Sequence, residues 1–112
     1  MRNRLRKIYQ SAIEYYDERL NSEPNNLEVL YNKALVLFEL KQYSESEKFC
    51  DKVLDLDSCH VNTLNLKGII AGFVSSDYKT AIAYFNKALD IEPQNERILK
   101  NKEFALSQLA SK

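Results

Sequence analysis

An all-α fold is the class that this sequence of 112 residues predicts, on three observations. Glycine and proline, the main turn formers, occur only twice each, which favours a few long elements over many short strands. Leu, Ala, Lys and Glu, which all suit helices, are plentiful. A third observation, an internal repeat long enough to hold two helices, decides how those helices are organised.

The repeat has a period of 34 and then 35 residues, counted between equivalent positions. One series of equivalent residues is Ala12, Ser46 and Ala81; Tyr16, Cys50 and Phe85; Leu20, Leu54 and Leu89; and Pro24, Ser58 and Pro93. A second series lies between these positions: Leu30, Leu64 and Leu99, with Ala34 paired to Gly68. One repeat therefore holds two helices and a turn.

These residues resemble the tetratricopeptide repeat, a helix–turn–helix of 34 residues with small residues at the helix crossing. The resemblance spans roughly residues 9–100. It implies a right-handed α-solenoid of antiparallel helix pairs, with about six helices in a single domain over residues 1–112. The implied divisions are a partial repeat over 1–24, full repeats over 25–58 and 59–93, and a capping helix over 94–112.

The first three helices follow from apolar spacing and capping residues. Residues 3–21 carry apolar side chains at three- and four-residue steps: Leu5, Ile8, Tyr9, Ala12, Tyr16 and Leu20. A second helix over 27–40 follows Asn25 or Asn26, either of which can cap it. A third helix over 44–55 begins with Ser44 and Glu47 at the spacing of a capping box.

The last three helices are expected over 61–74, 78–91 and 95–110. Asp77 caps the fifth, and the extra residue of the 35-residue repeat is placed in the turn Ser75-Ser76-Asp77. The sixth has one apolar and one polar side. Glu103 stands in it where Ala34 and Gly68 stand in the earlier repeats. Because a Glu cannot fit a tight crossing, we expect this helix to close the array with a polar face.

Composition excludes several function classes. Sixteen basic and sixteen acidic residues give a net charge of zero, which disfavours a dedicated nucleic-acid binder. No apolar run approaches the roughly 20 residues of a membrane span. No signal-type segment follows the basic residues Arg2, Arg4, Arg6 and Lys7. Two cysteines cannot make a disulfide framework, so we expect an intracellular, cytoplasmic protein, with the nucleus left open.

Catalytic and metal-binding constellations are not found. His60 is the single histidine, and its spacing to Cys50 and Cys59 matches no common zinc pattern. Cys50 replaces an aromatic anchor and is expected in the core, whereas Cys59 and His60 are expected at a turn and helix start. The sequence therefore predicts no enzyme, no cofactor and no metal.

A peptide-binding groove is what the resemblance implies instead. In the tetratricopeptide-repeat family the first helices of successive repeats line a concave face that receives an extended peptide or a helix. The matching candidates in this sequence are Glu28, Tyr31, Asn32, Leu35, Asn62, Asn65, Leu66, Ile69, Phe73, Arg97, Lys100 and Asn101, with Phe104 beside them.

One subfamily clamps the acidic C-terminus of heat-shock chaperones with Lys, Arg and Asn side chains. Asn32 matches the middle Asn of that clamp, but Asn62 and Leu66 stand where its Lys and Arg should be. Since a carboxylate clamp needs those cations, this interpretation is rejected. An apolar, amide-rich groove floor favours a ligand with apolar anchors and backbone groups that Asn can pair.

The favoured function is thus a noncatalytic protein–protein interaction module that binds a peptide or helix of another protein. One alternative is an oligomerisation or assembly scaffold module. The other is a regulatory repeat domain from a larger enzyme or co-chaperone. The N-terminal helix corresponds to the second helix of a repeat whose first helix is missing, so part of its apolar arc should face water. A homodimer through that helix could cover it.

Overall fold

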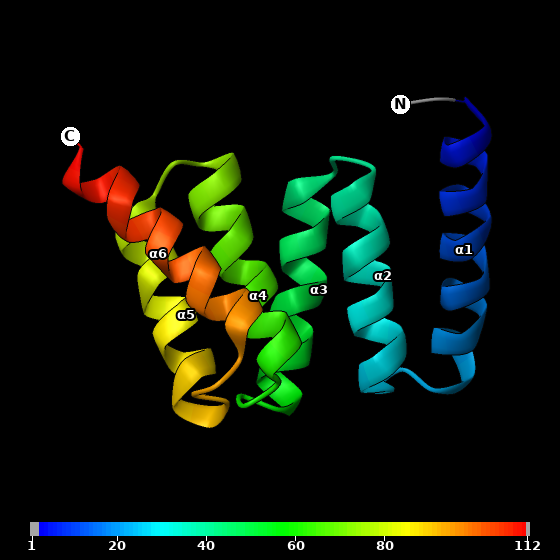
Figure 1. The fold of residues 1–112 in the computed structure, drawn as a ribbon. Coiled ribbons are helices and arrows are strands. Elements are labelled where there is room, and N and C mark those ends of the chain that lie inside the picture. Colours follow the sequence, from blue (N-terminus) through cyan, green and yellow to red (C-terminus); the bar gives the residue numbers. More distant parts are fainter. Residues whose placement is uncertain (1–2, 112) are drawn as a thin grey trace. The chain divides into compact units, whose positions relative to one another are not determined.

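The computed structural model describes residues 3–111 and confirms the all-α class. Its described residues form six α-helices and one five-residue π-helix, coloured along the sequence in Figure 1. The chain divides into two compact units, Met1–Leu56 and Asp57–Lys112. No helix within the described range is long and apolar enough to cross a membrane.

The first unit holds three successive antiparallel helices, α1 (Asn3–Ser22), α2 (Leu27–Glu39) and α3 (Tyr43–Leu56) (Figure 1). Helix α2 packs against both of its neighbours. At its crossing with α3, the buried Ser46 hydroxyl donates a hydrogen bond of 2.7 Å to the Ala34 carbonyl. Ala34, Ser46 and Cys50 are all fully buried, which confirms the predicted crossing and the core position of Cys50.

The second unit holds α4 (Val61–Ile69), the π-helix η1 (Ile70–Val74), α5 (Tyr78–Ile91) and α6 (Glu96–Ala110). Helix α5 packs against α4 on one side and α6 on the other. Gly68 lies directly against the ring of Phe85, which is fully buried. A small residue, as predicted, is therefore needed at this crossing, because the Phe85 ring leaves no room for a side chain at position 68.

Four helices begin with a side-chain cap. Asn26, His60, Asp77 and Asn95 each accept a hydrogen bond from the backbone N–H three residues later. This confirms Asp77 as a cap and His60 at a helix start. Helix α3 differs from its prediction.

The predicted cap of α3 is wrong in its position. The helix already includes Tyr43, so Ser44 lies inside its first turn instead of before it. The carbonyl of Gln42 accepts the Ser46 N–H as the first helical bond. A capping residue has extended backbone geometry, which a helical Ser44 cannot supply.

The extra residue of the longer repeat lies in a helix, which corrects the predicted placement in the turn. In the first unit the Leu40 N–H donates to the Val36 carbonyl, an α-type bond across four residues. The equivalent Ser75 N–H donates to the Ile70 carbonyl, across five residues. The turn itself keeps its length, because Lys41 and Ser76 occupy equivalent positions with φ of 63° and 56°. A single inserted residue, near Ala71, is absorbed as one π turn.

The outer face of α6 is less polar than predicted. Ile98 and Ala105 are buried, but Leu99 and Leu106 are exposed on either side of the exposed Glu103. These three residues are spaced by four and three positions, so they share one helix face. The face that closes the second unit is therefore mixed, with one carboxylate between two leucines.

Candidate functional site

In the second unit, a pair of Asn side chains joins α4 to α6. Asn101 on α6 donates a side-chain hydrogen bond of 3.0 Å to the Asn65 side-chain oxygen on α4. Asn65 is buried and Asn101 is half-buried. An Asn side chain has two N–H donors and one oxygen with two lone pairs, so each partner keeps further hydrogen-bonding capacity. Both residues were predicted for the groove, and the structure brings them together.

An exposed aromatic cluster joins α6 to η1, the π-helix that directly follows α4. The rings of Phe73 on η1 and Phe104 on α6 stack with centroids 4.8 Å apart and an interplanar angle of 19°. Tyr78 meets Phe104 edge-on, with centroids 6.4 Å apart. Phe73 remains 47% exposed and Phe104 39% exposed. Their exposure while stacked makes these rings a candidate contact surface for another molecule.

We call the set Asn65, Phe73, Asn101 and Phe104 the amide–aromatic face. Its geometry follows from helix periodicity: Asn101 and Phe104 are three residues apart and lie on one side of α6. Asn65 and Phe73 are eight residues apart, which is about 12 Å along a helix axis. The sequence identified each of these residues, but repeat spacing gave no sign of which side chains on α4 and α6 meet.

The remaining candidates divide between the two units. On α2, Glu28 is exposed and Tyr31, Asn32 and Leu35 are half-buried. In the second unit, Asn62, Arg97 and Lys100 are exposed, and Ile69 is half-buried. Leu66 is buried, at 3% exposed, which leaves little of its side chain for a ligand.

The histidine and the two cysteines, which could act in catalysis or bind a metal, occupy structural positions. His60 Nδ1 lies 3.3 Å from the Thr63 backbone nitrogen and 2.7 Å from the Thr63 hydroxyl, so the ring caps α4. Cys50 is buried, whereas Cys59 is exposed in the turn before that cap. Over the described range no cluster of three or more His, Cys, Asp or Glu side chains is arranged to hold a metal ion.

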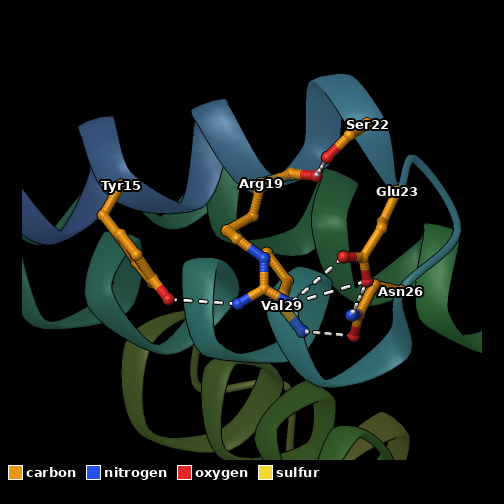
Figure 2. Close-up of polar contacts among 6 residues, drawn as sticks. All are labelled: Tyr15, Arg19, Ser22, Glu23, Asn26 and Val29. Carbon is orange, nitrogen blue, oxygen red and sulfur yellow. Dashed lines mark hydrogen bonds and ion pairs between the residues drawn. The ribbon is translucent and has the colours of Figure 1, made fainter.

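A surface network of hydrogen bonds and an ion pair lies at the end of α1 (Figure 2). Arg19 donates to the Tyr15 hydroxyl at 3.0 Å and forms an ion pair of 3.3 Å with Glu23. Asn26 donates to Glu23 at 2.7 Å while it caps α2. The hydrogen bond from Asn26 and the charge of Arg19 lower the pKa of Glu23 below its usual value. The network links the last turn of α1 to the cap of α2.

The sequence profile of the tetratricopeptide repeat matches residues 27–58 and 75–95. Both matched segments carry the tetratricopeptide repeat. The first matched segment covers α2 and α3, and the second covers α5 with its flanking turns. Between the two segments lie α4 and the π-helix, where this chain departs from the regular 34-residue repeat.

Curated relatives are longer proteins. The chain is 25% identical over 101 residues to Hsp70-Hsp90 organizing protein 3 of Arabidopsis thaliana, covering 90% of this chain and 18% of that protein. It is 31% identical over 97 residues to Translocon at the outer membrane of chloroplasts 64 of Pisum sativum, covering 87% and 16%. The chain thus spans less than a fifth of the length of either relative.

Among solved structures, the fold is similar to the first tetratricopeptide-repeat domain of Spaghetti (RPAP3) bound to the HSP90 peptide SRMEEVD. That likeness has a TM-score of 0.85 at 23% identity and covers 93% of this chain and 82% of the other. The first such domain of human RPAP3 gives a TM-score of 0.83 at 24% identity, over 92% and 80%. The helical-repeat fold inferred from the sequence is confirmed.

Proposed function

We propose that this protein-interaction module binds an extended peptide segment of a partner protein, without catalysis, on a surface that includes the amide–aromatic face. The observation that carries the proposal is the side-chain contact between α4–η1 and α6, where a polar amide pair lies near an exposed aromatic stack. A peptide needs both features, because its backbone requires hydrogen-bond partners and its side chains supply apolar anchors.

The spacing of the amide–aromatic face restricts where a bound peptide can place its apolar anchor. About 12 Å of helix separates Asn65 from Phe73, and an extended chain covers about 3.3 Å per residue. A bound segment would therefore place an apolar or aromatic side chain on Phe73 and Phe104 about four residues from the backbone groups paired by Asn65 and Asn101. Stacking on Phe104 adds to the affinity beyond simple area burial.

An acidic chaperone peptide fits this face less well. The Spaghetti domain is bound to SRMEEVD, which supports an extended peptide as the ligand class. In this chain Asn62 and Leu66 stand where a carboxylate clamp has its cations, and Leu66 is buried. Without charge-assisted hydrogen bonds from those positions, the carboxylates of such a peptide would have to leave water uncompensated.

The proposal also includes an intracellular location, in the cytoplasm or the nucleus. Two free thiols support a reducing compartment, since neither Cys50 nor the exposed Cys59 takes part in a disulfide.

The test is a selection of peptides from a random display library on the purified chain, followed by affinity measurements on synthetic copies. We expect selected sequences to carry an apolar or aromatic anchor. A Phe73→Ala/Phe104→Ala variant should lose about tenfold or more in affinity. An Asn65→Ala/Asn101→Ala variant should lose a smaller factor while keeping its unfolding midpoint close to wild type. Asn86→Ala, at an exposed position on α5, is the matched control and should bind normally.

Salt separates this ligand class from a charge clamp. Affinity for the selected peptides should change less than about tenfold between low and physiological salt, because screening weakens only exposed charge pairs. SRMEEVD, measured beside them, should bind weakly. Selection of peptides ending in Asp or Glu, with a steep loss of affinity in salt, would instead place the site on the cations of the last helix.

Self-assembly is a second candidate function, favoured by a different observation. Helix α1 has no buried residue, and three of its large side chains are well exposed: Leu5, Ile8 and Tyr15.

A further inference from the structure

The exposed apolar side chains of α1 form one stripe along the helix. Leu5 is 42% exposed, Ile8 56% and Tyr15 54%, and Ala12 lies between them. Their spacing of three, four and three residues is the pattern of a helix–helix seam. Outside the stripe, the apolar residues Tyr9, Ile13, Tyr16 and Leu20 are half-buried, as is Ala12 within it. The apolar residues predicted for this helix therefore fall into two groups. One group is half-buried in the first unit, and the stripe is exposed to solvent.

Tyr15 is held in place on the stripe. Arg19 donates to its hydroxyl at 3.0 Å, and the guanidinium carbon lies 5.9 Å from the ring centroid (Figure 2). Arg19 is itself anchored to Glu23 beyond the end of the helix. A side chain fixed in this way loses less conformational entropy when another surface covers it.

The charges beside the stripe are arranged head to tail. Arg4, Ser11 and Glu18 follow one another at seven-residue steps, so they line the same edge of the stripe. Lys7 and Glu14 repeat the pattern one row further out. All four charged residues are exposed, and no ion pair involves them within the part of the chain that the structure describes. The edge is basic in its first half and acidic in its second.

Such an edge is complementary to itself only when two copies run antiparallel. We propose that two copies of this chain associate through their α1 helices in antiparallel orientation about a two-fold axis near Ser11. Arg4 of one copy then faces Glu18 of the other, and Ile8 packs near Tyr15 of the partner. A two-fold axis uses each contact twice, so both charge pairs form together. In a parallel pair, Arg4 would face Arg4 and Glu18 would face Glu18, which repel.

This inference specifies the self-assembly candidate and is independent of peptide binding. The exposed Leu99 and Leu106 of α6 in a second copy are another apolar surface that could cover the α1 stripe. Glu103, which lies between them, argues against that pairing. A head-to-tail pairing of α6 with α1 would set the Glu103 carboxylate against the helix crossing and would produce open chains instead of a closed dimer.

The test is the molar mass of the full chain by light scattering or sedimentation from about 5 to about 500 μM. Wild type should pass from monomer to dimer across that range and go no further. Ile8→Asp should raise the dissociation constant by about tenfold or more, because it buries a charge in the seam. Gln10→Arg, about 160° around the helix from Ile8, is the control and should leave the dimer unchanged.

A charge swap tests the orientation. Glu18→Arg should weaken the dimer, since it creates two like-charge pairs, whereas Arg4→Glu/Glu18→Arg should restore it. The two positions are about 21 Å apart within one helix, so they cannot compensate inside a single chain. A chain that stays monomeric throughout overturns both this interface and the self-assembly candidate. A dimer indifferent to Ile8→Asp, a swap that does not restore association, or masses that grow beyond the dimer overturn the antiparallel interface alone.

Discussion

Gly68 packs directly against the ring of Phe85 at the crossing of α4 and α5. A Cβ added to Gly68 would lie 2.4 Å from Phe85 Cε1 and 2.8 Å from Cδ1, far inside normal contact distance. In the first unit the equivalent residues are Ala34 and Cys50. A smaller residue on the first helix therefore accompanies a larger one on the second, which keeps the volume of the crossing roughly constant.

Substitution of Gly68 tests this relationship. Gly68→Ala should destabilise the chain by about 1–3 kcal/mol, as overpacking does, although the same change in an open helix stabilises by about 0.5–1 kcal/mol. Gly68→Leu should be worse. Adding Phe85→Cys should make Gly68→Ala nearly harmless, because the pair then matches Ala34 and Cys50. Urea unfolding measures these effects, and wild-type stability in Gly68→Leu would contradict the crossing.

Deletion of Ala71 tests the π-helix. The change restores the 34-residue spacing, so η1 should become regular α-helix and the fold should persist with little loss of stability. Deletion of Ser76 is the matched comparison and should cost more, because it removes the left-handed residue that reverses the chain before α5. Backbone carbon chemical shifts report the helix type, and unfolding midpoints report the cost. If both deletions lowered the unfolding midpoint equally, the extra residue would have to be assigned to the turn and not to the π-helix.

His60 is expected to stabilise α4 as its helix cap. His60→Ala should cost about 1 kcal/mol of stability, since the Thr63 N–H then loses its side-chain acceptor. His60→Asn should recover most of that loss, because Asn26 and Asn95 cap α2 and α6 in the same way. Chemical denaturation compares the three proteins. A His60→Asn protein as unstable as His60→Ala would show that the ring has another role.

Glu23 should give a pH-dependent contribution to folding. Asn26 and Arg19 lower its pKa in the folded state, so the ionised carboxylate favours folding above the unfolded-state pKa. That contribution is lost as pH falls through the folded pKa. An NMR titration should place the Glu23 pKa below the ordinary value of a glutamate side chain. Arg19→Met should raise the Glu23 pKa toward its ordinary value, and an unchanged titration would remove Arg19 from the network.

Most of the secondary structure could be predicted because its signals are local. Asp77 and Asn26 cap the helices that follow them, and α5 covers the predicted residues. The start of α3 was misplaced because Ser44 and Glu47 satisfy a capping pattern that a helix can also hold inside its first turn. The polar outer face of α6 was overestimated, since helix periodicity places Leu99 on the apolar side without saying how far a neighbour reaches.

The sequence by itself determined the repeat, the helices and the small residues at each crossing, because period, propensity and residue size are written along the chain. Tertiary structure decided the rest. The meeting of Asn65 with Asn101 joins residues 36 positions apart, and the stacking of Phe73 on Phe104 depends on how α6 lies against α5. The π turn likewise appears only in the hydrogen bond from Ser75 to Ile70. Repeat spacing counts an inserted residue but cannot locate it, because only backbone geometry distinguishes a wider helical turn from a longer loop.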